Sequence, residues 1–208
     1  NDISGYAKSL TRYGHVAPSH KWVVSNNQWR SLVRSYLACV SFVADRVGKV
    51  LNALERSDKA QNTYVVLYSD HGFHLGEKEK WAKRSLWKNS TKVPLIISGP
   101  GIPKGETCDL PVQLLDIYPT LLELSGLASD PIHQGNSLIP ILKKGASEWP
   151  YVARTSIGPG NYSIVSKNYR FIQYNDNTSE LYDRINDPNE WYNLINNPNL
   201  SDVIEEHR

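Results

Sequence analysis

The chain has 208 residues, of which 40% are hydrophobic and 21% charged, and its formal net charge is +2. This composition is ordinary for a globular protein, and the charge is too small to indicate a nucleic-acid partner by itself. No apolar run is long enough to span a membrane, so a membrane span is not expected either. The chain begins with Asn1 and contains no Met, which predicts that residue 1 is not the start of translation.

The first predicted helix is long and follows a segment without clear periodicity. Residues 1–24 contain scattered Gly, Pro and polar residues, so we expect a surface loop there. Ser25–Gln28 fits a capping box, which predicts the beginning of a helix that ends near Ser57. Apolar residues behind this box repeat at three- and four-residue steps and predict one apolar face. Cys39 lies within that pattern, so we expect a buried free thiol.

Two apolar runs then predict strands, and two later segments predict helices. Thr63–Ser69 is rich in β-branched and aromatic residues without strict alternation, which is typical of a strand buried on both faces. Val93–Gly101 is a second short apolar run, stopped by Gly and Pro. Leu114–Gly126 and Asn136–Gly145 each predict a helix that ends at Gly.

The pattern changes in the last third of the chain. Short strand-like runs at residues 151–156, 162–175 and 179–183 are broken by Gly, Asn and Asp, which predicts an antiparallel sheet with hairpin turns. We therefore predict an α/β fold, with alternating helices and strands over residues 1–148 and a small α+β subdomain over residues 149–208.

A possible metal turn directly follows the first predicted strand. Asp70, His71 and Gly72 come where ligand sites gather in α/β sheets, at the carboxyl end of a strand. An Asp carboxylate suits Ca²⁺ or Mg²⁺, whereas an imidazole suits Zn²⁺ or Mn²⁺, so the pair alone leaves the metal open. We expect Gly72 to allow a sharp turn. The alternative is a structural turn in which Asp70 bonds a backbone N–H group.

Basic residues are concentrated after this turn, at Lys78, Lys80, Lys83, Arg84, Lys88 and Lys92. One interpretation is a solvated face of mixed charge, because Glu77 and Glu79 lie among them. The other is a loop that places one cation over an anionic sulfuryl or phosphoryl group. Trp81 and Trp87 flank the loop; we expect them to pack in a core, with stacking on a sugar as the less favoured alternative.

Several motifs in order resemble one known family. "SDHGFHLGE" followed by "KWAK", then "TKVPLIISGPG" and "PVQLLDIYPTLLELSGL", resembles the C-terminal half of a type I sulfatase of the alkaline phosphatase superfamily, in its iduronate-2-sulfatase-like branch. "YLACVSFVADRVGKVLNALE" and "ELYDRINDPNEWYNLINNP" are similar to other parts of that half. The resemblance implies the C-terminal part of a mixed sheet with flanking helices, followed by the antiparallel subdomain.

The resemblance also implies roles for particular residues. Asp70 and His71 match two metal ligands, around Ca²⁺ in sulfatases, and Lys83 matches the lysine that binds the sulfate group. His74 lies in the same loop and is a weaker candidate for substrate binding. His15 and His20 are weak candidates for the substrate histidine of the family, because their surroundings do not match.

Two elements of the family pattern are absent from this sequence. There is no Cys/Ser-x-Pro/Ala-x-Arg motif, which would carry the formylglycine nucleophile, and no Asp-Asp pair for the metal. We therefore expect both to lie upstream, in the N-terminal half of the same protein, and predict that residues 1–208 alone are inactive. The expected location is periplasmic, secreted or lysosomal.

The sequence leads to a primary prediction and two alternatives. The primary prediction is part of a sulfatase that hydrolyses a sulfate ester, such as one on a sugar, with a divalent metal and an upstream formylglycine. One alternative is a phosphoryl or phosphoethanolamine transferase or a phosphatase of the same superfamily. The other is a non-catalytic module that binds a sulfated glycan through the basic loop.

Overall fold

The computed structural model describes residues 3–12, 17–128, 130–144 and 149–208. Its first elements correct the expected surface loop, because two short helices, α1 (Gly5–Leu10) and α2 (His20–Ser25), lie in that segment. Ser4 and Ser19 begin them, since each hydroxyl accepts a hydrogen bond from a backbone N–H of the first turn. Ala7 of α1 is fully buried against the C-terminal sheet, so this segment is part of the fold.

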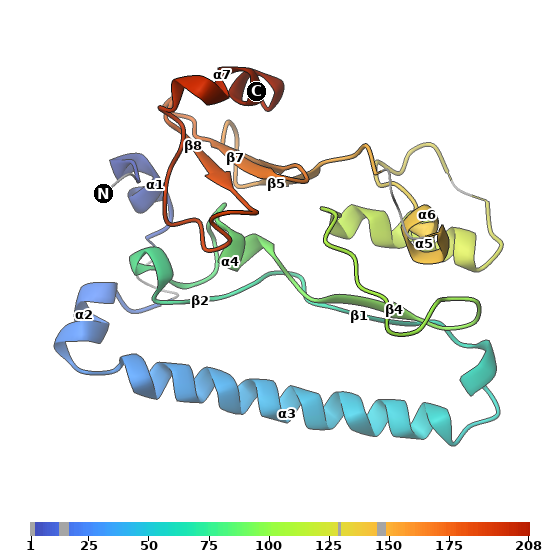
Figure 1. The fold of residues 1–208 in the computed structure, drawn as a ribbon. Coiled ribbons are helices and arrows are strands. Elements are labelled where there is room, and N and C mark those ends of the chain that lie inside the picture. Colours follow the sequence, from blue (N-terminus) through green and yellow to red (C-terminus); the bar gives the residue numbers. More distant parts are fainter. Residues whose placement is uncertain (1–2, 13–16, 129, 145–148) are drawn as a thin grey trace.

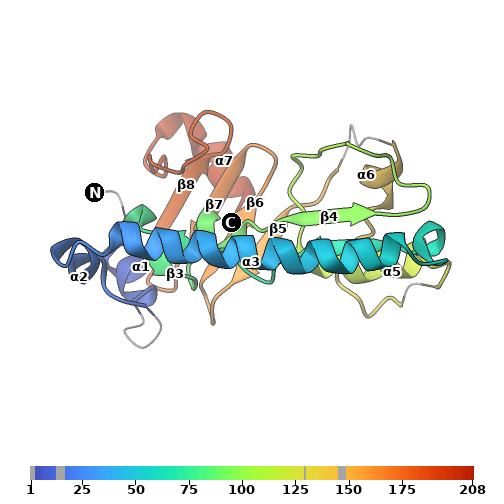
Figure 2. The same ribbon diagram turned by 90° about the horizontal axis from the view of Figure 1, so that it is seen from below.

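The long predicted helix is confirmed as α3 (Trp29–Glu55), which runs along one side of the molecule (Figures 1 and 2). The expected capping box is wrong: Ser25 ends α2, and Gln28 begins α3 without a side-chain cap. The expected buried thiol is also wrong, since Cys39 is exposed. Ser25 cannot cap α3 because its hydroxyl donates to the Trp22 carbonyl within α2, and Cys39 is exposed because no described part of the chain covers this stretch of α3.

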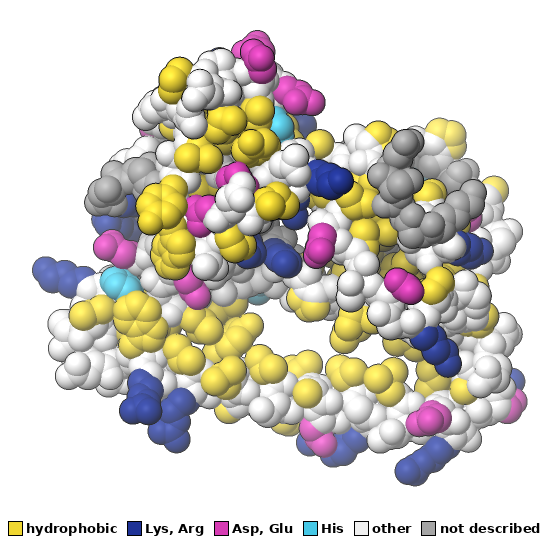
Figure 3. Space-filling view, in the orientation of Figure 1, with side chains coloured by type: hydrophobic (Ala, Val, Ile, Leu, Met, Phe, Trp, Pro, Cys, Tyr) yellow, Lys and Arg dark blue, Asp and Glu magenta, His cyan; other side chains and the backbone are white. Residues whose placement is uncertain are grey.

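The apolar face of α3 is exposed along its length, and no residue of the helix is buried. Figure 3 shows hydrophobic side chains along the edge of α3 that faces the rest of the molecule, where they border an open space. The exposed large hydrophobic residues of this helix are Trp29, Tyr36, Leu37, Val40, Phe42, Val43, Val50 and Leu51. Monomeric proteins rarely expose a continuous apolar face of this kind to water.

A turn of 3₁₀ helix, η1 (Ala60–Asn62), leads from α3 to a two-stranded antiparallel sheet. This sheet pairs β1 (Val65–Tyr68) with β4 (Leu95–Ser98), and Tyr68 lies opposite Leu95. Both predicted strands are confirmed, but β1 is not buried on both faces, because Leu67 and Tyr68 are exposed. In the described part of the chain no third strand extends this sheet.

The segment between β1 and β4 contains short elements that shape the candidate site. These are β2 (His74–Leu75), the 3₁₀ turn η2 (Glu77–Glu79), β3 (Trp81–Ala82) and α4 (Lys88–Thr91). Strands β2 and β3 pair antiparallel, so the chain folds back on itself before it enters α4. Beyond β4 come η3 (Leu114–Asp116) with α5 (Ile117–Leu124), and then α6 (Ile139–Lys144), in the two segments where helices are predicted.

The C-terminal antiparallel sheet is confirmed, with strands in the order β5 (Ala153–Ser156), β6 (Tyr162–Val165), β7 (Tyr169–Gln173) and β8 (Ser179–Asp183). The chain closes with η4 (Pro198–Leu200) and α7 (Ser201–Glu206). The buried hydrophobic core joins this sheet to α1 and to the segment before α4, through Ala7, Leu86, Trp87, Ile172, Tyr174 and Tyr182. The boundary after residue 148 stays a prediction, since residues 145–148 lie outside the described residues.

Candidate active site

The end of β1 presents the first two candidate ligands. Asp70 has 82% of its side chain exposed and His71 34%, so both can be reached by a ligand. Ser69 Oγ donates to the His71 carbonyl at 2.8 Å, and the Gly72 N–H donates to the Ser90 carbonyl at 2.8 Å. The first bond holds the backbone of the turn itself, and the second attaches the turn to α4.

The ring of His71 is oriented by its own neighbour. Nδ1 lies 2.8 Å from the Gly72 carbonyl oxygen, which can only accept, so Nδ1 carries the hydrogen. In the neutral ring Nε2 then carries no hydrogen, so its lone pair can accept a hydrogen bond or bind a metal. Nε2 lies 3.7 Å from Oδ1 of Asp70. Metal-binding histidines commonly donate their other N–H group to a carbonyl in this way.

Lys83 completes the group of side chains that the sequence predicted. Its Nζ lies 2.7 Å from Nε2 of His71, although the two residues are twelve positions apart in sequence. Other lysines of the loop point elsewhere: Lys80 donates to the Thr11 carbonyl, Lys88 to the Pro188 carbonyl, and Lys78 to the Glu190 carbonyl. The basic loop is therefore not a uniformly solvated face, because its lysines have different and specific partners.

The backbone around Lys83 is strained. Ala82 (φ 63°) and Arg84 (φ 68°), its two neighbours, are left-handed, as are Lys78 (φ 52°) and Glu79 (φ 57°). Left-handed backbone costs a non-glycine residue about 1–2 kcal/mol, so it persists only where the surrounding structure holds it. Such strain gathers at functional sites, which makes this loop the most unusual backbone of the described chain.

Gly72 is required here for a different reason from the one expected. It is not among the glycines with positive φ, so the turn itself does not need glycine. A Cβ atom at this position would lie 2.1 Å from the Asn89 carbonyl oxygen. The residue therefore permits close approach of this turn to α4.

The other candidates of the loop, His74, Trp81 and Trp87, are buried in the protein. His74 is 1% exposed, and its Nε2 lies 2.9 Å from Ser85 Oγ, while its Nδ1 has no hydrogen-bond partner among the described residues. Burial lowers the pKa of His74 to about 4, so the ring is neutral near pH 7. No described contact supports its substrate role, which stays a prediction. Trp81 and Trp87 are buried, which confirms core packing over sugar stacking.

The two weaker histidine candidates do not join this group. His20 packs on Trp81, with its Nδ1 accepting from Trp81 Nε1 at 3.3 Å, and its ring also meets Trp29 edge-on. His15 lies outside the described residues. No substrate histidine is therefore identified among the described residues, and the candidate role of His15 stays a prediction.

Two donors alone do not make a complete metal site. Among the residues that the structure describes, no group of three or more His, Cys, Asp or Glu side chains could hold a metal ion. Two ligands that bind one Ca²⁺ at right angles lie about 3.4 Å apart, close to the spacing of Asp70 Oδ1 and His71 Nε2. The pair thus fits part of a ligand set.

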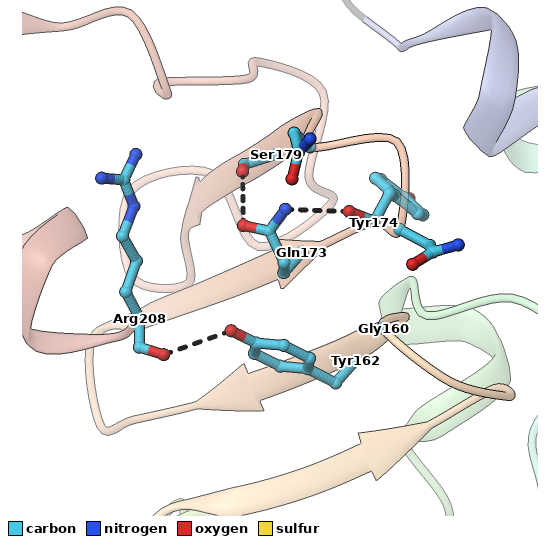
Figure 4. A pocket seen from close by; sticks show the side chains of 8 residues that line it. Gly160, Tyr162, Gln173, Tyr174, Ser179 and Arg208 are labelled. Atoms are coloured by element: carbon cyan, nitrogen blue, oxygen red, sulfur yellow. Dashed lines mark hydrogen bonds between the residues drawn. The ribbon is translucent and has the colours of Figure 1, made fainter.

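A hollow on the C-terminal sheet is lined by Tyr162, Gln173 and Ser179, among others (Figure 4). Its polar groups bond one another: Ser179 Oγ donates to Gln173 Oε1 at 2.9 Å, and Gln173 Nε2 donates to the Tyr174 carbonyl at 2.9 Å. Tyr162 likewise donates to the Arg208 carbonyl at 3.2 Å. These polar groups are therefore already paired with one another.

None of the helices described is long and apolar enough to cross a bilayer.

The chain matches two family models. The model described as Sulfatase covers residues 5–127, and the model described as N-sulphoglucosamine sulphohydrolase, C-terminal, covers residues 76–208. The second match agrees with the predicted likeness to the C-terminal half of a sulfatase. The more specific assignment to the iduronate-2-sulfatase-like branch stays a prediction.

Individual relatives agree with these models. A sulfatase from Formosa agariphila is 46% identical over 91% of this chain and 38% of its own length. N-acetylglucosamine-6-O-sulfatase from Bacteroides thetaiotaomicron is 32% identical over 92% of this chain and 37% of its own length. The chain therefore spans less than half the length of these relatives.

A solved structure gives the same result for the fold. The structure of a protein in complex with its substrate D-glucosamine-2-N,6-O-disulfate matches with a TM-score of 0.76 and 27% identity, over 97% of this chain and 42% of that chain. The predicted α/β fold with a C-terminal antiparallel sheet is thereby confirmed. Taken with the two family models, these matches show that the chain belongs to the sulfatase family, within the alkaline phosphatase-like superfamily.

Proposed function

We propose that the full-length protein that carries this chain hydrolyses sulfate esters, and that Lys83 binds the sulfate group. The observation that carries the proposal is the placement of Lys83 beside Asp70 and His71, on the most strained loop of the described chain. A lysine ammonium offers a compact positive charge for the sulfuryl oxygens, on which negative charge develops during the reaction.

The proposed substrate class is a sulfated sugar. This proposal is supported by the relatives, one of which is an N-acetylglucosamine-6-O-sulfatase, and by the solved structure that holds a disulfated glucosamine. The described residues add a sulfate-binding cation but no exposed tryptophan beside it, since Trp81 and Trp87 are buried. Contacts to the sugar ring are therefore proposed to come mainly from other parts of the protein.

A divalent cation, with Ca²⁺ as the first choice and Mg²⁺, Mn²⁺ or Zn²⁺ as alternatives, is proposed to bind Asp70 and His71. The carboxylate oxygen and the unprotonated Nε2 supply two donors, and the other ligands would come from outside this chain. When bound, such a cation stabilises negative charge on the substrate. Asp70 and His71 would hold it, while Lys83 holds the sulfate.

The rest of the sulfatase domain is proposed to cover the apolar face of α3. That face is exposed along the helix, and the chain spans only 38% of the Formosa sulfatase. The formylglycine nucleophile and the missing metal ligands would lie in that second part. We propose, accordingly, that residues 1–208 alone do not turn over sulfate esters, and that the full protein works in the periplasm, outside the cell or in a lysosome.

The experiment is an assay of sulfate release by the full-length protein, on an aryl sulfate and on a sulfated glucosamine. We expect activity that the Lys83→Ala variant loses by about 100-fold or more in kcat, as when one charge-stabilising donor is removed. The matched control is Lys104→Ala, which removes an exposed lysine and should leave activity unchanged. A faster reaction on an aryl phosphate would favour the phosphatase alternative, and binding without turnover would favour the glycan-binding module.

A further inference from the structure

We propose that Lys78 is a positioning residue that holds the loop of Lys83 against the C-terminal sheet. This inference rests on the proposed role of Lys83 in binding sulfate. It assigns a function to the C-terminal sheet, which supplies none of the candidate ligands. The argument begins with the contacts of Lys78 itself.

The Lys78 side chain reaches into the C-terminal part of the fold. Its Nζ donates to the Tyr182 hydroxyl at 3.0 Å and to the Glu190 carbonyl at 2.6 Å, across more than a hundred residues of sequence. The ammonium also lies 4.3 Å from the centre of the Tyr182 ring, in a cation–π contact. Lysines usually keep the ammonium group in water. The contacts of the Lys78 ammonium with Tyr182 and Glu190 therefore hold the N-terminal end of the loop that contains Lys83.

The second end of the loop is held by a buried acid. Glu190 Oε2 accepts from the Lys88 N–H at 2.9 Å, and its Oε1 accepts from Arg170 Nε at 2.5 Å. Arg170 in turn donates to the Leu86 carbonyl at 3.4 Å, and Lys88 Nζ donates to the Pro188 carbonyl. Glu190 is 2% exposed and Arg170 4%, so the charge-assisted bond between them is shielded from water.

One chain of hydrogen bonds connects the two ends. The Tyr182 hydroxyl accepts from Lys78 and donates to Glu180 at 2.9 Å. Glu180 also accepts from Trp87 Nε1 at 2.7 Å and from the Tyr174 hydroxyl at 3.2 Å. Lys78 and Trp87 lie on opposite sides of Lys83 in sequence, so the network spans the loop. Removal of one member would leave buried polar groups without partners.

The strained backbone explains why such support is needed. Ala82 and Arg84, on either side of Lys83, are left-handed, and this conformation is disfavoured for both residue types. If either end of the loop is released, the backbone can relax and carry the Lys83 ammonium away from His71. A displacement of about 1 Å at a reacting group can cost about 100-fold in rate.

The experiment is a double-mutant cycle in the full-length protein, with kcat on an aryl sulfate and the melting temperature measured for each variant. Lys78→Met keeps the apolar stem and removes the ammonium, and should lower kcat by about 10- to 100-fold. In the Lys83→Ala background the same change should have little further effect, because the residue that it positions is gone. Lys104→Met, an exposed control, should leave kcat unchanged.

Tyr182→Phe provides a second route to the same link, because it removes only the hydroxyl that joins Lys78 to Glu180. It serves if Lys78→Met fails to fold, and it should show the same dependence on Lys83. The inference is overturned if both variants keep wild-type kcat, or if they lower it by the same factor with and without Lys83. Failure of the proposed function has a separate signature: no sulfate release by the wild type, or full activity of Lys83→Ala.

Discussion

Nζ of Lys83 lies 2.7 Å from Nε2 of His71. Because Nδ1 of the ring donates to the Gly72 carbonyl, Nε2 carries no hydrogen in the neutral ring and has a lone pair to offer. That nitrogen has one lone pair, so it can accept from the lysine or bind a metal, but not both. A cation held by His71 and Asp70 must therefore move the Lys83 ammonium off the ring. The released ammonium is then available to an anionic group placed beside the metal.

This competition predicts opposite effects of substitutions at neighbouring residues. Asp70→Asn and His71→Ala should each weaken binding of Ca²⁺ by the full-length protein by at least about 10-fold, since the first removes the negative charge of a ligand and the second removes the ligand itself. Lys83→Ala should retain or strengthen binding, because it removes the competing donor and a nearby positive charge. Metal analysis after dialysis against limiting Ca²⁺ measures all three. Weaker binding by Lys83→Ala would contradict the competition, and unchanged binding by the other two would contradict the metal site.

Gly72 provides a stability prediction with a matched control in the same chain. Gly72→Ala should lower the free energy of unfolding of the full-length protein by at least about 2 kcal/mol, because its Cβ would lie 2.1 Å from the Asn89 carbonyl. Gly48→Ala should instead be neutral or stabilise by up to about 1 kcal/mol, because Gly48 is helical and a Cβ there meets nothing. Denaturant unfolding compares the two. Equal midpoints would show that α4 can move away from the turn without cost.

The elements and the site were predictable to the extent that they depend on local sequence. The period of apolar residues predicted α3, and β-branched runs and turn residues predicted β1, β4 and the C-terminal sheet. The grouping of Asp70, His71 and Lys83 followed from a motif whose members lie within fourteen positions. A serine at each helix beginning, Ser4 and Ser19, was a local signal that could have revealed α1 and α2.

The remaining features depend on contacts that sequence patterns do not contain. The apolar face of α3 predicts burial, but whether it is buried depends on what covers it. Glu180 and Glu190 are buried because they meet Trp87 and Lys88, about a hundred residues earlier in the chain. A glutamate within the strand-like run "SELYD" was the available signal, since buried acids are rare unless they are paired.

The exposed face of α3 predicts opposite effects of one substitution in two contexts. Residues 1–208 alone should self-associate, and Val43→Asp should reduce this by placing a charge on the apolar face. In the full-length protein the same change should destabilise by at least about 2 kcal/mol, because the charge is then buried. Ser41→Asp, on the opposite side of the helix, should do neither. Light scattering and denaturant unfolding are the measurements, and a monomeric, cooperatively folding isolated chain would contradict the prediction.

His74 predicts how stability depends on pH. Its pKa is lowered from 6.5 to about 4 by burial, so the unfolded chain binds the proton more readily than the folded chain. The stability that the neutral ring provides is therefore complete above pH 6.5 and is lost as the pH falls towards 4. A shift of this size corresponds to about 3 kcal/mol. His74→Gln, whose amide can still donate to Ser85, should unfold with a flatter pH dependence over that interval. Denaturant unfolding of both full-length proteins between pH 7 and 4 measures the difference, and parallel curves would show that the ring does not titrate as its burial requires.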